Sequence, residues 1–255
     1  MDEQRTGKRV LGSFIDALTW DQALSRIDGW AARRESRVVC ICNAHSVVTA
    51  SGEPEFQRVL NTADMATPDG APVAWMLQRL GFPGQTRISG PDLMWRYCEM
   101  AAQSGHGIYF YGSTPATLDL LAVKLGQSFP ELVIAGRVSP PFRALSAEED
   151  EAAVRAINDS GAGVVFVGLG CPKQELWMAA HRGRVNAVMI GVGAAFDFHA
   201  GTISRAPRWM RENGLEWLHR LASEPRRLWR RYLVTNSLFI LGGARQLLLS
   251  GDRNG

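Results

Sequence analysis

Short apolar runs alternate along the chain with longer stretches in which apolar residues recur at helical spacing. Runs of four or five apolar residues, bounded by glycine or polar residues, are typical of strands buried on both faces. The predicted strands lie at residues 38–42, 107–111, 163–167 and 187–191, with shorter ones at 63–66 and 132–134. Strands that alternate with helices indicate an α/β fold: a Rossmann-like, mostly parallel sheet with helices on both faces.

The segments between these strands carry helix signals. A helical pattern runs from the first strand to about Leu60, and Pro91 stands at the first position of another helix, where its missing N–H costs nothing. Thr114 is a candidate N-cap for the helix after the strand at 107–111. The remaining helices are predicted at residues 72–80, 91–104, 148–158 and 173–181.

The pattern changes from Trp209 onward, where leucines and tryptophans recur at helical spacing among arginines, and Pro225 divides the stretch into two helices. The apolar run at residues 232–241 is too short to span a bilayer but suits an amphipathic helix lying on one. The alternative is a helical hairpin that caps the core and whose arginines are solvated. We therefore expect an α/β domain at 1–204 and a helical appendage at 205–255.

Charge sharpens this division. Hydrophobic residues make up 46% of the 255 residues, which supports a packed core and excludes a mainly disordered chain. The net charge is +3, but residues 205–255 hold ten arginines and four acids, so this segment carries +6 and the rest −3. A basic tail favours an anionic partner. Its leucines and tryptophans favour a membrane surface over nucleic acid, and exposed apolar surface there could instead serve homo-oligomer formation.

The sequence also indicates where the protein is located and which cofactors it uses. The polar N-terminus has no signal-peptide pattern and no run reaches about 18 apolar residues, so we expect a cytoplasmic protein without a membrane span. The four cysteines have no metal-ligand spacing and are expected in the core. Neither HExxH nor Asp-x-Asp occurs, so no metal and no cofactor are expected.

Candidate chemistry gathers where the predicted strands end. Ligands of open α/β sheets bind beyond the carboxyl ends of the strands, and the loops there are 43–45, 112–114, 168–174 and 191–197. Three of them are rich in glycine, which lets a backbone approach phosphate at a helix N-terminus. Together they indicate a nucleotide or sugar-nucleotide site. The G-x-G-x-x-G fingerprint is absent, which counts against an NAD enzyme.

Four polar residues near these loops have two interpretations each. Asp69 is either turn punctuation or a general base, and Arg87 is either a phosphate contact or a surface residue. Gln174 is either a sugar or nucleobase contact or an exposed first-turn residue. Asp197 lies between two phenylalanines after a buried strand, so its carboxylate should have a protein or ligand partner.

Seven motifs extend this picture over nearly the whole chain. They are Pro68-Asp69-Gly70, Arg87-Ile88-Ser89-Gly90-Pro91-Asp92, Gly168-Leu169-Gly170-Cys171-Pro172-Lys173-Gln174-Glu175, Gly191-Val192-Gly193-Ala194-Ala195-Phe196-Asp197, Arg205-Ala206-Pro207, Gly214-Leu215-Glu216-Trp217-Leu218-His219-Arg220-Leu221 and Glu224-Pro225-Arg226-Arg227. In order and spacing, from about residue 10 to 240, they resemble the WecG/TagA/CpsF glycosyltransferases.

The resemblance implies an inverting transfer from a UDP-sugar, of the N-acetylmannosamine type or its uronic acid, to a polyprenyl-diphosphate-linked sugar at the cytoplasmic face of the inner membrane. It implies Asp69 as the catalytic base and places Arg220, Arg227 and Arg230 on an appendage that reaches the membrane. The candidate substrate-binding residues, from the loops and the resemblance together, are Asn43, His45, Arg87, Gly112, Gly170, Lys173, Gln174, Gly193, Phe196 and Asp197.

One position departs from the family pattern, and other functions remain open. The family often has Thr-x-Asn after the first strand, whereas this chain has Ile41-Cys42-Asn43, so a hydroxyl that contacts substrate is replaced. The alternatives are a sugar-nucleotide epimerase or dehydrogenase, and a non-catalytic nucleotide-binding protein docked on membranes. The sequence alone leaves the donor sugar, the acceptor and the linkage undetermined.

Overall fold

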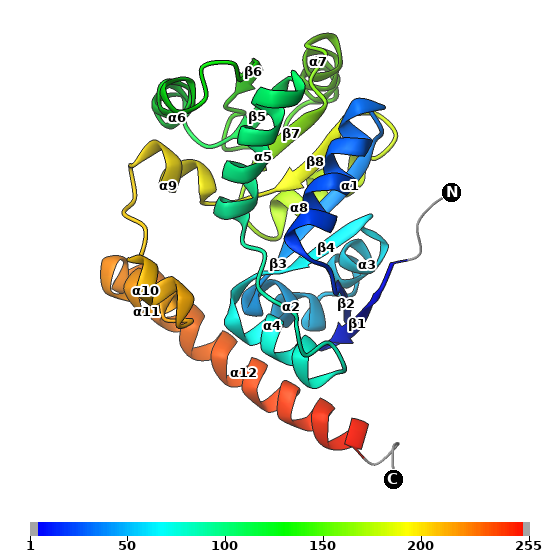
Figure 1. Ribbon diagram of the computed structural model, residues 1–255, viewed down its shortest axis with the longest axis vertical. Helices are drawn as coiled ribbons and strands as arrows, with labels where there is room; N and C mark the ends of the chain where they lie inside the picture. Colours follow the sequence, from blue (N-terminus) through cyan, green and yellow to red (C-terminus); the bar gives the residue numbers. More distant parts are fainter. Residues whose placement is uncertain (1–4, 252–255) are drawn as a thin grey trace.

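The computed structural model describes residues 5–251, apart from the side chains of Arg227, Ser250 and Gly251. Its centre is a six-stranded sheet in the order β4-β3-β8-β7-β5-β6, in which every neighbouring pair is parallel (Figure 1). The strands are β3 (Arg37–Cys42), β4 (Met65–Pro68), β5 (Ile108–Gly112), β6 (Ile134–Val138), β7 (Val164–Gly168) and β8 (Val188–Gly191). The predicted parallel α/β sheet is confirmed.

Helices cover both faces of this sheet, as predicted. On β3, the side chains of Val38, Cys40 and Cys42 join one core cluster and those of Val39 and Ile41 the other, as the two-residue period of a strand requires. The first cluster is covered by α2 (Ala44–Gly52), α3 (Pro54–Thr62), α4 (Gly70–Arg79), α7 (Ala147–Asp159) and α8 (Lys173–Ala180). The second is covered by α1 (Trp20–Ala32), α5 (Gly90–Ser104), α6 (Pro115–Ser128) and α9 (Ala195–Ala200).

A hairpin of β1 (Gly7–Val10) and β2 (Ser13–Asp16) precedes α1, and the sequence pattern did not predict these elements. The hairpin lies beside the edge strand β4. The buried Asp16 carboxylate accepts a hydrogen bond of 2.6 Å from the backbone N–H of Ala66 and pairs with Arg5 at 2.7 Å. The Asp16 carboxylate therefore binds the N–H of an edge-strand residue. Without it, this N–H could pair with a strand of another molecule.

Three predicted boundaries shift. The strand expected at 63–66 is β4 at Met65–Pro68, and the one expected at 132–134 is β6 at Ile134–Val138. Pro68 is accommodated because β4 is an edge strand, where a missing N–H does not break the sheet. The long helix expected up to about Leu60 is two helices, since Pro54 begins α3 directly after α2.

The C-terminal part contains α10 (Arg208–Glu212), α11 (Glu216–Ser223) and α12 (Pro225–Gly251), so the predicted break at Pro225 is confirmed. Figure 1 shows α12 running past α2 and α4 along one side of the molecule. Its packing against the body is close: a Cβ on Gly242 would lie 3.0 Å from Leu11 Cδ2, and one on Gly243 would lie 3.2 Å from Met76 Sδ. Phe239 is buried on the same side of the helix.

The other side of α12 is exposed and apolar. Leu233, Ile240, Leu241 and Leu248 each expose more than 60% of their surface. No helix in the described part of the chain is both long and apolar enough to cross a bilayer. The expected boundary between residues 204 and 205 falls in the connection from α9 to α10.

Candidate active site

Asp69 lies at the carboxyl edge of the sheet, directly after β4. Pro68 pairs with Cys42 at the end of β3, and the Asp69 backbone N–H donates to the Cys42 carbonyl at 2.9 Å. The Pro68 carbonyl accepts from the Ile88 backbone N–H at 2.8 Å. These two hydrogen bonds place the ends of two strands and the segment that carries Arg87 around the Asp69 carboxylate.

Burial raises the pKa of Asp69 from its ordinary value of 3.8 to about 6. The nearby Glu216 carboxylate raises it further, whereas the Arg87 guanidinium and the Gly70 backbone N–H oppose the shift. A carboxylate with a pKa close to neutrality is both mostly ionised at pH 7 and basic enough to accept a proton from a hydroxyl. The environment of Asp69 is therefore suited to general-base catalysis.

Arg87 connects this carboxylate to the C-terminal segment. Its Nη1 donates to Glu216 Oε2 at 3.0 Å, and its Nη2 lies 3.9 Å from Asp92 Oδ2. Glu216 belongs to α11, 129 residues away along the chain, whereas Asp92 stands in the first turn of α5. The guanidinium predicted to hold phosphate is therefore held between two carboxylates from different parts of the fold.

Asp92 gathers two further arginines. Its Oδ1 lies 2.7 Å from Arg205 Nη1 and 3.5 Å from Arg211 Nη1, and its Oδ2 accepts from the Ser89 hydroxyl at 2.6 Å. Burial alone would raise the pKa of Asp92, but the hydrogen bonds from Arg205 and Ser89 and the arginine charges outweigh it and lower the pKa to about 2. Sequence analysis assigned no role to Asp92, Arg205 or Arg211, although the first two stand in the quoted motifs.

Gln174 joins the loops that follow β7 and β8. Its Oε1 accepts from the Gly193 backbone N–H at 3.1 Å, and its Nε2 donates to Glu175 Oε1 at 2.8 Å. Both side chains are buried, and burial raises the pKa of Glu175 to about 7. The sequence did not indicate a buried Glu175, because an acid in the first turn of a helix is ordinarily exposed. The described contacts give Gln174 a structural role in addition to the predicted ligand contact.

Asn43 and His45 begin α2 beside Asp69. The Asn43 side chain caps the helix by accepting from the Ser46 backbone N–H at 3.1 Å. Burial lowers the pKa of His45 to about 4, and the charge of Arg231 on α12 adds to this effect. His45 is therefore neutral at pH 7, and α12 brings positive charge to this candidate substrate loop.

Two more candidate residues, Gly112 and Phe196, lie at closely packed positions of the fold. A Cβ on Gly112 would lie 2.5 Å from the Gly168 carbonyl oxygen, so only glycine lets the ends of β5 and β7 meet. Phe196 is fully buried and packs edge-on against Phe110 with ring centroids 5.4 Å apart. These contacts belong to the fold, and a substrate contact at either position stays a prediction.

The remaining loop candidates face less crowded surroundings. Gly170 has a φ of +80° with open space around the position of a Cβ, and Lys173 is exposed at the start of α8. Asp197 accepts a hydrogen bond from the Thr202 hydroxyl at 3.2 Å, which supplies the protein partner expected for it. These residues follow β7 and β8; β8 adjoins β3 in the sheet, and β7 adjoins β8. Their ligand contacts remain predictions.

The three appendage arginines lie in different surroundings. The Arg220 guanidinium carbon stands 5.6 Å from the Phe198 ring centroid, close to the loop after β8. Arg230 is exposed and stands over the neighbouring Trp229 ring at 5.7 Å. The side chain of Arg227 lies outside the described residues. Only Arg220 among the described pair therefore approaches the carboxyl edge of the sheet.

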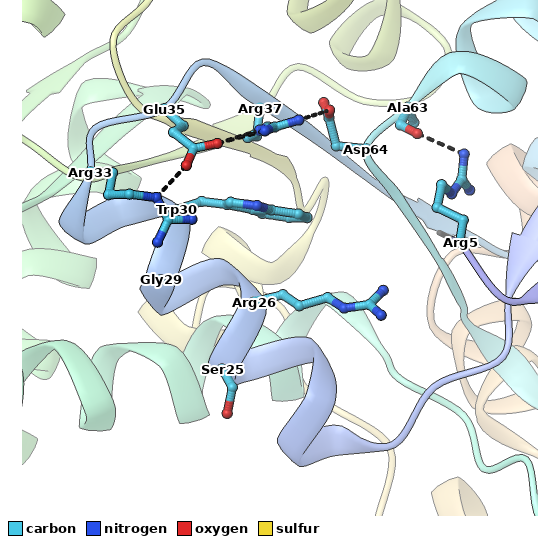
Figure 2. Close-up of a pocket in the computed structure, with 10 residues that line it drawn as sticks. All are labelled: Arg5, Ser25, Arg26, Gly29, Trp30, Arg33, Glu35, Arg37, Ala63 and Asp64. Atoms are coloured by element: carbon cyan, nitrogen blue, oxygen red, sulfur yellow. Dashed lines mark hydrogen bonds and ion pairs between the residues drawn. The ribbon is translucent and has the colours of Figure 1, made fainter. Parts of the chain in front are cut away.

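A cavity of about 560 Å³ lies at the opposite, amino edge, near the starts of β3 and β4 (Figure 2). It is lined by Arg5, Ser25, Arg26, Gly29, Trp30, Arg33, Glu35, Arg37, Ala63 and Asp64. Figure 2 shows Glu35 between Arg33 and Arg37. None of the candidate residues lines it, so we assign the chemistry to the carboxyl edge. Within residues 5–251, no three His, Cys, Asp or Glu side chains are grouped as metal ligands would be.

Comparison with known proteins agrees with this geometry. Residues 8–253 match the glycosyl transferase family WecG/TagA/CpsF. The chain is also similar to the N-acetylglucosaminyldiphosphoundecaprenol N-acetyl-beta-D-mannosaminyltransferase of Bacillus spizizenii (strain W23), with 33% identity over 196 residues, 73% of this chain and 74% of that enzyme. The chain therefore belongs to the WecG/TagA/CpsF family of glycosyltransferases.

Proposed function

We propose that this protein transfers a sugar from a UDP-sugar to a polyprenyl-diphosphate-linked sugar, with inversion at the anomeric carbon and with Asp69 as the general base. The N-acetylmannosaminyl group named for the Bacillus relative makes an N-acetylmannosamine-type donor our first choice. The reaction would serve the synthesis of a cell-surface polysaccharide at the cytoplasmic face of the membrane.

The environment of Asp69 carries this proposal. A carboxylate at the carboxyl edge of a parallel sheet lies where such folds bind ligands. Its pKa of about 6 suits proton acceptance, and Arg87 stands close enough to influence that pKa. A base beside a cation that can bind phosphate is one arrangement that supports transfer from a nucleotide sugar.

The proposed step is a single displacement. The Asp69 carboxylate takes the proton of an acceptor hydroxyl while the hydroxyl oxygen forms a bond to the anomeric carbon of the donor. The bond from that carbon to the diphosphate oxygen breaks, and UDP leaves with the electron pair. Help from a positioned base is worth about 10²–10⁴-fold in rate.

Arg87 and the neighbouring arginines would receive the negative charge that develops on UDP. Guanidinium groups present paired N–H donors to phosphate and keep their charge at all physiological pH values. We therefore propose a metal-independent reaction and expect transfer to continue at an unchanged rate in excess EDTA. A loss of more than tenfold, restored by Mg²⁺ or Mn²⁺, would contradict this part of the proposal.

The exposed apolar side of α12 supports a membrane-surface location. Leu233, Ile240, Leu241 and Leu248 form it, and arginines surround the start of the helix. An amphipathic helix of this kind binds through buried apolar area plus attraction to anionic lipids. Docking along α12 would bring the carboxyl edge of the sheet toward a lipid-linked acceptor.

The deciding experiment compares wild-type protein with Asp69→Asn, using UDP–N-acetylmannosamine and a short-chain lipid-diphosphate N-acetylglucosamine acceptor. We expect Asp69→Asn to lose transfer by at least 100-fold and to retain UDP binding. Asp159→Asn, an exposed acid at the end of α7, serves as the matched control. Near wild-type turnover by Asp69→Asn would remove Asp69 from the mechanism, and product without anomeric inversion would exclude a single displacement.

A further inference from the structure

Buried guanidinium N–H groups without acceptors gather at the junction between the α/β body and α11. Among the described side chains they are Arg205 Nε and Nη2, Arg211 Nε and Arg220 Nε. All four atoms belong to the short stretch from 205 to 220. A buried charged donor without an acceptor is unfavourable, and such defects are rare in folded proteins. Their concentration here indicates a missing anionic partner.

The geometry of Arg205 and Arg211 supports the same conclusion. Each guanidinium contacts Asp92 Oδ1 through its Nη1 atom, at 2.7 Å and 3.5 Å. Asp92 therefore orients both guanidinium groups but contacts only one nitrogen atom of each. The Nε atom of Arg205 lies 3.9 Å from Glu216 Oε1, too far for a hydrogen bond. The remaining N–H groups are held in place and available to a ligand.

Charge favours an anion with several oxygens. Three arginines, Arg87, Arg205 and Arg211, face the two carboxylates of Asp92 and Glu216. These five side chains therefore carry a net charge of +1, before the adjacent Asp69 carboxylate is counted. Its donors come from several planar guanidinium groups, which match the geometry of phosphate oxygens. Arg87 donates a hydrogen bond to Glu216. A bound phosphate oxygen would replace the Glu216 carboxylate as the acceptor of this hydrogen bond.

We propose that Arg205 and Arg211 are diphosphate-binding residues, which act with Arg87 and are oriented by Asp92. This inference rests on the proposed function, because it concerns the diphosphate of that reaction. Two substrates carry this group, the UDP-sugar donor and the polyprenyl diphosphate acceptor. The backbone N–H of Ile88, next to Arg87, donates to the carbonyl of Pro68, next to Asp69, at 2.8 Å, so the cluster lies beside the candidate base, where either diphosphate would bind.

Binding measured without transfer tests the proposal. Calorimetric titrations with UDP, with farnesyl diphosphate and with inorganic pyrophosphate would compare wild type with Arg205→Gln and Arg211→Gln. Loss of charged hydrogen bonds should weaken Kd by about 10–100-fold for each variant. The matched control is Arg208→Gln, because Arg208 is exposed on the same segment and pairs only with Glu212 among the ion pairs observed. Its Kd values should stay within twofold of wild type.

The ligands distinguish the two sources of diphosphate. Weaker binding of UDP alone assigns the cluster to the donor, and weaker binding of farnesyl diphosphate alone assigns it to the acceptor. Unchanged Kd values for all three ligands in both variants would overturn the proposal. If Arg205→Gln fails to fold, as circular dichroism would show, Arg205→Lys replaces it and should give an intermediate loss, since one ammonium cannot replace the planar fork.

The outcome is separable from that of the transfer experiment. Asp69→Asn should bind UDP as wild type does, so a failure of the base assignment leaves the titrations interpretable. If transfer is absent with every donor but the two arginine variants still lose diphosphate binding, the cluster is correct and the proposed reaction is wrong. If transfer depends on Asp69 while Arg205 and Arg211 have no effect on any Kd, only the present inference fails.

Discussion

Replacing Asp69 by asparagine is expected to stabilise the folded protein near neutral pH while it abolishes transfer. The Asp69 side chain forms no capping bond to α4, so the substitution removes no helix cap. It removes a carboxylate that burial and Glu216 hold at an unfavourable pKa. The cost of keeping this charge in the folded state should therefore disappear in the variant.

The pKa of Asp69 gives the size of the effect. Its rise from 3.8 to about 6 means that the folded protein holds this proton more tightly than the unfolded chain does. The stability of wild type thus falls as pH rises from about 4 through about 6, and the asparagine variant lacks this loss. A shift of about two pKa units at about 1.4 kcal/mol each sets an upper limit of about 3 kcal/mol. Because Asp69 is partly exposed, we expect about 1–2 kcal/mol.

Urea unfolding followed by far-UV circular dichroism at pH 4, 6 and 8 would measure this difference. The gain in unfolding free energy for Asp69→Asn should be near zero at pH 4 and reach its full value at pH 8. Asp159→Asn, at an exposed position, should show no such pH dependence. A gain that is equal at all three pH values, or a less stable variant at pH 8, would refute the electrostatic reasoning.

Three further changes test other parts of the site. Glu216→Gln removes a charge that raises the pKa of the candidate base, so the acid limb of the kcat/KM profile should move to lower pH; an unmoved limb would contradict the coupling. Gln174→Leu removes the acceptor of the part-buried Gly193 N–H and one donor to the buried Glu175 carboxyl. It should cost about 1–3 kcal/mol in urea unfolding, whereas a cost below about 0.5 kcal/mol would show that other contacts hold the two loops together. The double variant Leu241→Glu with Leu248→Glu should no longer bind phosphatidylglycerol vesicles, although its stability should be unchanged. The control variant Leu120→Glu on α6 should still bind them. Equal vesicle binding by the two variants would show that α12 does not dock on membranes.

Local pattern predicted most of the sheet and its helices. Continuous apolar runs identified the central strands, because a strand buried on both faces has no polar position to confuse its period. The missed α1 also had a signal: Ala23, Leu24, Ile27 and Ala31 recur at helical spacing after a Thr19–Gln22 capping box. The strands β1 and β2 have only four residues each and gain their stability from contacts with the sheet edge, so a local pattern could not identify them.

The candidate site was predictable only in part. Asp69 and Arg87 could be proposed from motifs, because each stands beside a turn or a helix start. The ion-pair network could not, since Glu216 meets Arg87 across 129 residues and Asp92 meets Arg205 through tertiary packing. Spacing along the chain carries no information about such distances. The same holds for Glu175, whose burial depends on the strands packed around it.

The two adjacent glycines of α12 have a mechanical consequence. At Gly242 and Gly243 the helix lies so close to Leu11 and Met76 that it cannot tilt away without opening the core around Phe239. In contrast, α10 and α11 contain no buried residue. These two helices are therefore held to the body by ion pairs such as Arg211–Asp92 and Glu216–Arg87, which a bound anion can exchange, and not by buried apolar side chains. Any displacement that admits a substrate should move these two helices and leave the sheet and α12 in place.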